Sequence, residues 1–263
     1  MITWETSPEI FKLGPIAVRW YSLAFILGFF LGEKYASHYL IKEKGFTKDE
    51  VTKLLYYMIT GTIIGARLGH CLFYEPGYYL SNPVQILMVW KGGLASHGGF
   101  TGVIAALWLF SKYVKSLDFV WLLDLMAPPA LLTGAFIRLG NLMNSEILGK
   151  PTDGTWGFIF KRVDMIPRHP AQLYESLGFA FVALIGYYLY IKQRQKLKPG
   201  FIIGFILFGG FTHRFIVEFF KENQVAFENS MALNMGQLLS IPMILIGIIL
   251  MFYKSSSHVA KKA

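Results

Sequence analysis

The chain has 263 residues, of which 54% are hydrophobic and only 16% charged, and its mean hydropathy is +0.45. Soluble domains usually carry about 25% charged residues, so this composition argues against a soluble protein and favours helices that border lipid and need no polar face. The net charge of +9 does not indicate nucleic-acid binding, because the basic residues lie between apolar runs, where they favour anionic headgroups and set topology.

Seven segments have the length of a membrane-spanning helix, which needs about 20 mostly apolar residues. In chain order they are Ile16–Ile41, Val51–Phe73, Gly98–Val114, Leu117–Ile137, Pro170–Ile191, Gly200–Phe220 and Leu233–Tyr253. The first run has neither a basic segment before it nor a small-residue cleavage site after it, so we expect a retained span and not a removed signal peptide. The short apolar run Val84–Trp90 predicts an interfacial or re-entrant piece.

We therefore predict an all-α polytopic membrane protein with about seven transmembrane helices, forming a single integral membrane domain over residues 1–263. Its orientation follows from the loop lysines and arginines, because the side that carries more of them is cytoplasmic. The smaller set is Lys12, Lys91, Lys150, Lys161, Arg162, Arg168 and Lys221. The N-terminus and the connections Ser81–Gly93 and Asn144–Arg168 are thus expected outside, and the C-terminus inside. The proline, glycine and aromatic residues of Asn144–Arg168 predict a small extracytoplasmic cap.

Several ionisable residues fall within the predicted spans, where charges are costly and usually functional. They are Arg67, Asp124, Arg138, Glu175, Arg214 and Glu218. Residues near the ends of spans can instead extend their charged groups to the interface, but these six fit that explanation less well. Arg214 and Glu218 are one helical turn apart, which a simple ion pair also explains.

His97 lies in a glycine-rich segment, Gly92–Gly99, at the outer start of the third span. Gly98 and Gly99 let the backbone approach a ligand closely. A histidine titrates near neutral pH, so it can accept a proton from a weakly acidic nucleophile. The alternative is a turn histidine that only caps a helix.

A second polar cluster, Arg138–Glu146, closes the fourth span at the same outer side. Arginine offers a planar fork of donors that matches phosphate oxygens. Asn141 follows Arg138 by three residues, so helical geometry places both on one face; Asn144 and Glu146 follow. The alternative is a purely structural cluster at a helix end.

Metal and cofactor motifs are absent from the sequence. The single cysteine, Cys71, excludes both an intrachain disulfide and a cysteine-pair metal site, and the six histidines are scattered. There is no nucleophile elbow and no phosphate-binding P-loop, which argues against a soluble-type hydrolase and an ATP-driven pump. We expect no metal and no cofactor.

Taken in order, the motifs resemble those of the bacterial prolipoprotein diacylglyceryl transferase family over nearly the whole chain. They are Arg19–Tyr21 (RWY), Gly65–Gly69 (GARLG), His97–Gly99 (HGG), Arg138–Glu146 (RLGNLMNSE), His169–Glu175 (HPAQLYE), Arg214–Glu218 (RFIVE) and Met235–Ser240 (MGQLLS). The fourth is the signature of the family. Two positions depart from the family pattern: Ile137 replaces a common glycine, and Gly210 replaces a tyrosine one turn before the second arginine.

The resemblance implies seven transmembrane helices in the bacterial cytoplasmic (inner) membrane and an active site toward the outer leaflet. It implies transfer of the diacylglyceryl group of phosphatidylglycerol to the lipobox cysteine of a prolipoprotein signal peptide, giving a thioether and glycerol phosphate. Arg138 and Arg214 would hold the donor's phosphate, and His97 would take the thiol proton or position the group that does.

The remaining motif residues are expected to support the same chemistry. Tyr21 would hydrogen-bond the lipid head. Asn141, Asn144 and Glu146 would orient the donor, and Gly140 belongs to the same binding segment.

Two other functions stay open on the sequence alone. A lipid or solute transporter could line a pathway with intramembrane charges, although transporters often show repeated halves, and no repeat is found here. A phospholipid-processing transferase with another acceptor is the second alternative. Joining labelled phosphatidylglycerol to a lipobox peptide would separate all three.

Overall fold

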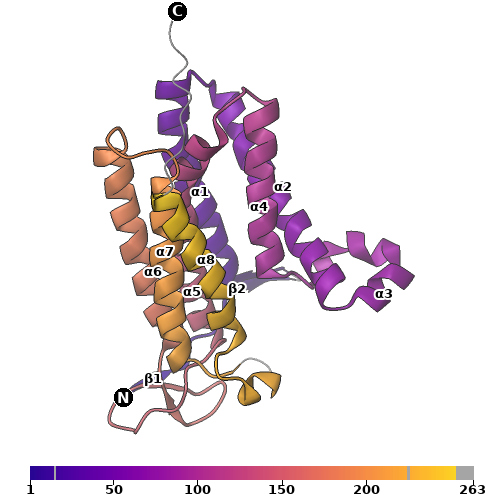
Figure 1. The fold of residues 1–263 in the computed structure, drawn as a ribbon. Helices are drawn as coiled ribbons and strands as arrows, with labels where there is room; N and C mark the ends of the chain where they lie inside the picture. The colour runs from indigo at the N-terminus through magenta and orange to yellow at the C-terminus, as the bar shows by residue number, and fades with distance from the viewer. Residues whose placement is uncertain (15, 224–225, 253–263) are drawn as a thin grey trace, which may run out of the picture. The chain divides into compact units, whose positions relative to one another are not determined.

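A computed structural model describes residues 1–14, 16–223 and 226–252 (Figure 1). The described part is mainly helical. Its α-helices are α1 (Trp20–Lys44), α2 (Lys48–Phe73), α3 (Pro76–Ser81), α4 (Ser96–Tyr113), α5 (Phe119–Asn144), α6 (Ala171–Tyr188), α7 (Phe201–Val217) and α8 (Met235–Phe252). The strands are β1 (Ile2–Trp4), β2 (Glu9–Leu13), β3 (Ile16–Arg19), β4 (Phe158–Phe160) and β5 (Pro167–Arg168).

Four helical segments of the described residues are long and apolar enough to cross a membrane. They are Phe119–Asn144, Ala171–Gln193, Phe201–Phe220 and Met235–Phe252. These coincide with the last four predicted spans, while α1, α2 and α4 occupy the first three. The prediction that the first span begins at Ile16 is wrong, because residues 16–19 pair with β2 as an antiparallel strand and the helix begins at Trp20.

The run Val84–Trp90 forms 3-10 turns and not a span. They are η1 (Pro83–Leu87) and η2 (Val89–Lys91), and Leu87 and Trp90 are largely exposed on them. The run is therefore too short to span, and its interfacial or re-entrant position stays a prediction.

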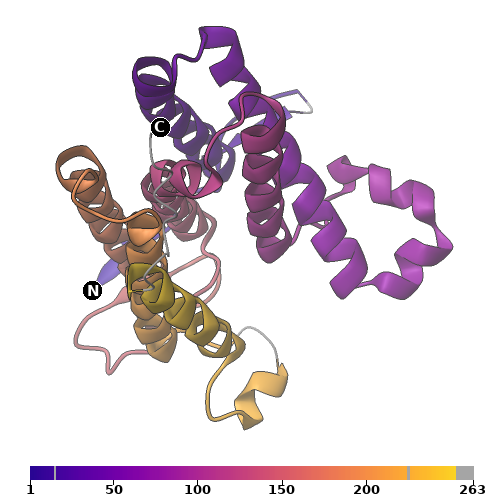
Figure 2. The ribbon, with the colours of Figure 1, turned by 45° about the horizontal axis from the view of Figure 1, so that its top comes forward.

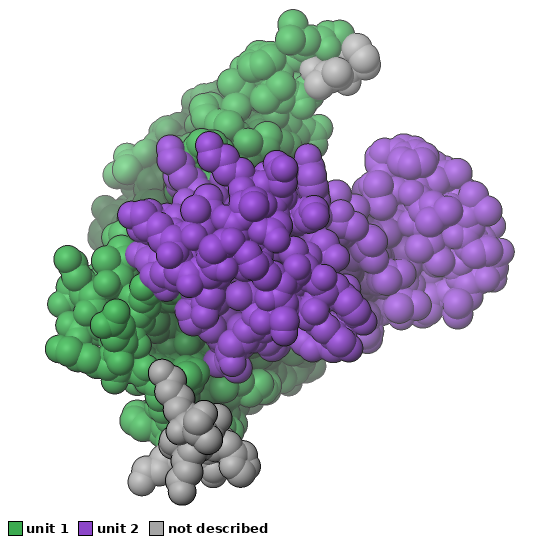
Figure 3. All heavy atoms as spheres, turned by 90° about the horizontal axis from the view of Figure 1, so that it is seen from above, with its two compact units in different colours: residues 1–30, 124–263 green, residues 31–123 purple. Residues whose placement is uncertain are grey.

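Packing divides the chain into two compact units. The first unit comprises residues 1–30 and 124–263, and the second comprises residues 31–123 (Figure 3). In the first unit α7 lies side by side with α6 and with α8 (Figure 1 and Figure 2). In the second unit α2 and α4 form the main helix pair.

Asp124 is a buried carboxylate of the first unit with a structural role. Its two oxygens accept hydrogen bonds from the backbone nitrogens of Gly200 (2.7 Å) and Ile203 (2.8 Å) at the start of α7. The first N–H groups of a helix have no partner within the helix, and an anion there also interacts favourably with the helix dipole. An intramembrane charge that the sequence marked as a functional candidate is therefore explained by helix capping.

Asp124→Ala should destabilise the protein without directly removing a contact to substrate. Loss of a side-chain helix cap costs about 0.5–2 kcal/mol, and we expect the upper half of that range because Asp124 is buried. Thermal unfolding of the purified variant in detergent measures the loss. Unchanged stability together with lost transfer activity would contradict the capping role.

A small sheet joins the N-terminus to the Asn144–Arg168 connection. Strand β1 pairs in parallel with β4, which pairs antiparallel with β5, in the order β1-β4-β5. Phe158 and Phe160 of β4 pack with Leu142 and Leu148 in a buried cluster. This connection is thus folded and anchored on the end of α5.

An ion pair strengthens the same connection. The Arg168 guanidinium donates to Asp164 at 2.7 Å and to Glu222 at 3.0 Å. The hydrogen bond from Arg168 holds the pKa of Asp164 below its usual range, so this pair stays ionised at neutral pH.

The second unit depends on close contact between α2 and α4. A Cβ on Gly65 would lie 2.7 Å from the Cα of Gly102, and one on Gly69 would lie 2.8 Å from the Cα of Gly98. Such distances leave no room for a side chain, and small residues allow membrane helices to approach this closely. The glycines at 65 and 69 therefore serve packing.

Arg67 anchors the loop that follows α3. Its guanidinium is buried and donates to the carbonyls of Ile86 (2.9 Å), Gln85 (2.5 Å) and Gly92 (2.5 Å). It also lies over the ring of Tyr79. Backbone carbonyls thus satisfy a second buried charge that the sequence marked as a functional candidate.

Candidate active site

Five ionisable side chains of the first unit lie close together, and two of them are buried carboxylates. Glu175 of α6 is fully buried, and its Oε2 lies 3.1 Å from Nε of Arg138 and 3.4 Å from Nζ of Lys221. Its Oε1 lies 3.9 Å from Nη1 of Arg214. Helices α5, α6 and α7 each supply one member, which their packing brings to one place. We call Arg138, Glu175, Arg214, Glu218 and Lys221 the ionic cluster.

Glu218 is the second carboxylate of the ionic cluster. It lies 3.4 Å from Arg214, accepts a hydrogen bond from Lys221 at 2.7 Å, and accepts another from Asn234 at 3.2 Å. A Cβ at Gly236 would collide with this carboxylate, so a larger residue at that position would displace the Glu218 side chain. The cluster thus includes contacts from the start of α8.

The ionic cluster carries more positive than negative charge. Arg138, Arg214 and Lys221 are three cations, and Glu175 and Glu218 are two carboxylates. The side chains of Arg138 and Arg214 keep 16% and 27% of their surface exposed, whereas Lys221 keeps 4%. The two arginines are therefore accessible to an anion, whereas Lys221 is buried against the carboxylates of Glu175 and Glu218.

A chain of hydrogen bonds extends the ionic cluster along the end of α5. Arg138 donates to Asn141 (3.2 Å), Asn141 donates to Glu146 (3.2 Å), and Asn144 donates to the same carboxylate (3.1 Å). Ser145 and Ile147 have φ angles of 55° and 56°. This left-handed conformation ends the helix and turns the chain back, which brings Glu146 to Asn141. Four of the residues that the sequence singled out are thus connected.

Tyr21 stands at the start of α1 beside the same segment of α5. A Cβ at Gly140 would lie 2.9 Å from Cδ2 and 3.2 Å from Cα of Tyr21. The Tyr21 ring also packs edge-on against Phe25, 5.2 Å away. Gly140 is required for this close approach, so the contact with Tyr21 explains why no side chain stands there.

His97 belongs to the second unit, in the first turn of α4. Its side chain is exposed, and its ring stacks on Tyr74 with a centroid distance of 5.8 Å and lies 5.9 Å from Phe73. The cap position is Ala95, and among the described residues no hydrogen bond involves a ring nitrogen of His97. The imidazole is thus open to a substrate and does not cap the helix.

The two glycines after His97 differ in their surroundings. A Cβ at Gly98 would collide with the backbone of α2 at Gly65, whereas one at Gly99 would make an ordinary contact of 3.5 Å with Ala66. Gly98 therefore holds α4 against α2. This packing fixes the position of the turn that carries His97.

Comparison with known proteins identifies the family. The family model described as prolipoprotein diacylglyceryl transferase matches residues 8–253. A relative from Bacteroides fragilis, named phosphatidylglycerol–prolipoprotein diacylglyceryl transferase, is 48% identical over 264 residues, covering 96% of this chain and 95% of its own. Relatives of the same name from Tolumonas auensis and Chloroherpeton thalassium are each 47% identical over 251 residues; both alignments cover 95% of this chain, and 96% and 93% of the respective relative.

The chain belongs to the prolipoprotein diacylglyceryl transferase family. It is a transferase, as the resemblance implies. Its apolar helices are those of a membrane protein, and its relatives are bacterial. The transporter alternative is not favoured. Every motif that carried the resemblance lies inside the matched residues.

Three members of the ionic cluster, Lys221, Glu175 and Glu218, were not among the site residues predicted from the sequence. Glu218 was noted only as an intramembrane charge and as a possible ion-pair partner of Arg214. Lys221 was counted only as an outer loop lysine, although its spacing of three residues from Glu218 is typical of a side-chain pair. Glu175 was noted as an intramembrane charge but was not assigned to the site. Glu175 could have been assigned from the free-energy cost of burying a carboxylate within a predicted span, because such a group needs cations nearby.

Proposed function

We propose that the chain transfers the diacylglyceryl group of phosphatidylglycerol to the lipobox cysteine of prolipoprotein signal peptides, the first step of bacterial lipoprotein maturation. The cysteine sulfur forms a thioether with the glyceryl C3, the C3–O bond breaks, and glycerol phosphate leaves with the bonding electrons. The names of the relatives support both substrates. The observation that carries the proposal is the ionic cluster, because Arg138 and Arg214 share the buried Glu175 and keep part of their surface exposed, which suits an anionic phosphodiester.

Arg138 and Arg214 are the proposed phosphate-binding side chains. Glu175 and Glu218 hold both guanidinium groups in place, so the donors are preorganised before the lipid binds. Negative charge grows on the phosphate as the C3–O bond breaks, and fixed donors in a low-dielectric site stabilise such charge strongly. The cluster would thereby favour the transition state over the bound lipid.

His97 is the proposed acceptor of the thiol proton. A cysteine thiol has a pKa of about 8.5, so little thiolate exists at neutral pH, and an exposed imidazole is a suitable base. Asn141, Asn144, Glu146 and Tyr21 are proposed to orient the donor. Gly98, Gly99 and Gly140 are proposed to lie along the bound donor, and Gly98 and Gly140 also give the backbone the close approaches that these side chains need.

The arrangement in the membrane is part of the same proposal. We infer a single integral membrane domain with seven spans in the inner membrane, the active site toward the outer leaflet, and residues 144–168 as an extracytoplasmic cap. The side of the membrane on which the C-terminus is predicted to lie carries more loop lysines and arginines, and this supports the orientation.

Thiol labelling tests the orientation. In a Cys71→Ala background, Ser81→Cys and Asp153→Cys should react with a membrane-impermeant maleimide in intact spheroplasts, and Lys196→Cys should react only after lysis. All three positions are exposed. The reverse labelling pattern would overturn the proposed topology.

The activity is tested with purified protein, phosphatidylglycerol labelled in its glyceryl backbone, and a lipobox peptide. We expect label in a thioether on the peptide and release of glycerol phosphate. A peptide with serine in place of the cysteine is the control. Label that reaches another acceptor, or lipid moved without chemical change, would replace the proposed function.

A further inference from the structure

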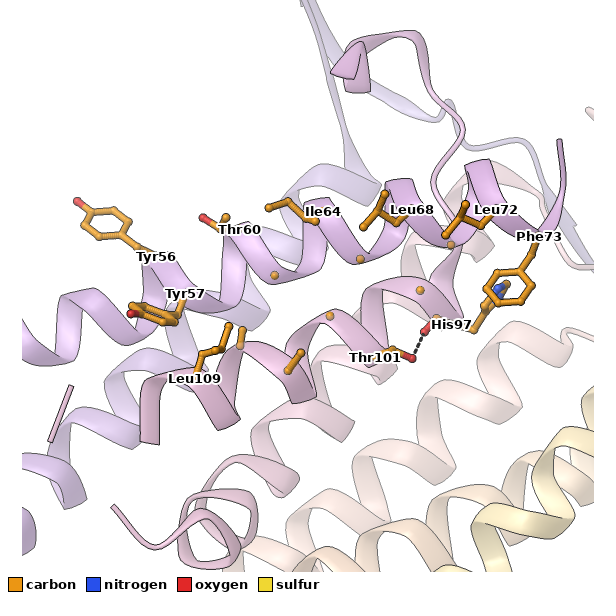
Figure 4. Close-up of a pocket in the computed structure, with 17 residues that line it drawn as sticks. Tyr56, Tyr57, Thr60, Ile64, Leu68, Leu72, Phe73, His97, Thr101 and Leu109 are labelled. Atoms are coloured by element: carbon orange, nitrogen blue, oxygen red, sulfur yellow. Dashed lines mark hydrogen bonds between the residues drawn. The ribbon is translucent and has the colours of Figure 1, made fainter. Parts of the chain in front are cut away.

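The second unit contains an apolar groove between α2 and α4 with a volume of about 800 Å³ (Figure 4). His97 and Phe73 stand at one end, and Tyr56, Tyr57 and Leu109 stand at the other. We call it the α2–α4 groove. It is continuous with the candidate catalytic histidine and otherwise almost entirely apolar.

The floor of the α2–α4 groove follows from the helix packing. Gly61, Gly65, Gly98 and Gly102 line it, and the α2 and α4 backbones touch at these positions. With no side chains at the contact, larger side chains on both helices rise as walls along its length. The groove therefore depends on the glycines at the contact, because a Cβ at any of these four positions would force the helices apart.

The dimensions of the groove decide which occupant it fits. From His97 to Leu109 is twelve residues of α4, about 18 Å at 1.5 Å per residue, somewhat more than one leaflet of a hydrocarbon core about 30 Å thick. The groove is apolar along this length and carries the imidazole at one end, which suits a hydrocarbon chain whose polar head lies beside His97.

We propose that the α2–α4 groove holds an acyl chain of the phosphatidylglycerol donor and that its far end sets the preferred chain length. The inference rests on the proposed function, since it assigns the tail of that donor. The polar head would lie at the His97 end and the terminal methyl near Tyr56 and Leu109. A chain longer than the groove meets these side chains.

Ala105→Trp tests the length limit. Ala105 lines the groove two turns from His97 and is exposed, so a larger side chain there fills the groove and not the helix contact. Transfer from dipalmitoyl phosphatidylglycerol should fall at least about tenfold relative to transfer from the dioctanoyl lipid. In an apolar pocket a single methylene group already changes the specificity ratio by about tenfold or more. Ile104→Trp is the matched control, because Ile104 is exposed on the same helix but does not line the groove.

An unchanged ratio of the two lipids in Ala105→Trp, or the same change in Ile104→Trp, would overturn the inference. These outcomes leave the proposed function intact provided the wild-type chain transfers from either lipid to the lipobox peptide. Failure of the wild-type chain with both lipids would refute the proposed function itself.

Photolabelling of the wild-type chain gives a second test that does not depend on a variant. Phosphatidylglycerol with a diazirine at the end of one acyl chain should label Tyr56, Tyr57 or Leu109 in nanodiscs, and excess unlabelled phosphatidylglycerol should suppress the adducts. Equal labelling of outward residues such as Ile104 would identify the occupant as bulk lipid and overturn the assignment.

Discussion

Arg138→Lys should reduce diacylglyceryl transfer by about 10²–10³-fold, the loss that follows removal of one preorganised donor in an oxyanion site. Lysine keeps the positive charge, and an ion pair with Glu175 remains within reach. It loses the planar fork that donates to Asn141 while contacting Glu175. The loss should fall mainly on kcat, since charge on the phosphate grows in the transition state.

Arg168→Lys is the matched control for this prediction. Arg168 is likewise an arginine held by carboxylates, Asp164 and Glu222, but it lies in the β1-β4-β5 sheet and outside the ionic cluster. Both variants lose a guanidinium fork, and only Arg138→Lys should lose transfer at equal amounts of folded protein. Near-normal activity of Arg138→Lys would reduce Arg138 to a structural charge.

The sequence predicted the helices better than the function of the charges within them. Apolar runs of about 20 residues gave the positions of the helices because bilayer thickness fixes their length. The start of the first helix was misplaced, since Ile16–Val18 is apolar but pairs with β2. Pairing between strands depends on contacts that hydropathy does not record.

The intramembrane charges show why the site was only partly predictable. Asp124 and Arg67 looked like functional candidates by the same criterion as Arg138 and Arg214, yet they bind backbone groups at a helix start and in a loop. Their partners are distant in sequence, and backbone groups carry no sequence signal. The arginines of the ionic cluster differ because other side chains hold them.

The remaining parts of the site depend on local geometry. Arg138 and Asn141 were predictable as neighbours from helical spacing, and in the structure Nη1 of Arg138 lies 3.2 Å from Oδ1 of Asn141. Glu146 reaches Asn141 only because Ser145 and Ile147 adopt positive φ, which is uncommon for such residues. Lys221 enters the cluster after α7 has ended, through the short turn that begins at Glu218.

His97→Gln should fold and still bind phosphatidylglycerol, yet transfer about 10²–10⁴-fold more slowly, the usual contribution of a general base. The exposed imidazole makes ring contacts with Tyr74 and Phe73 that a glutamine can partly replace. Gly98 and Gly99 stay unchanged, so the helix contact that positions the turn is preserved. Slow transfer with normal lipid binding is therefore the expected result.

The pH–rate profile distinguishes a base from a positioning group. If His97 takes the thiol proton, raising the pH should partly rescue His97→Gln, because solvent then supplies thiolate from a cysteine whose pKa is about 8.5. Wild-type transfer should instead depend less steeply on pH, because the chain itself takes the thiol proton. The rates are measured with a lipobox peptide in lipid nanodiscs. Two profiles of the same shape that differ by a constant factor would make His97 a positioning residue, and loss of lipid binding in the variant would place it in the donor site instead.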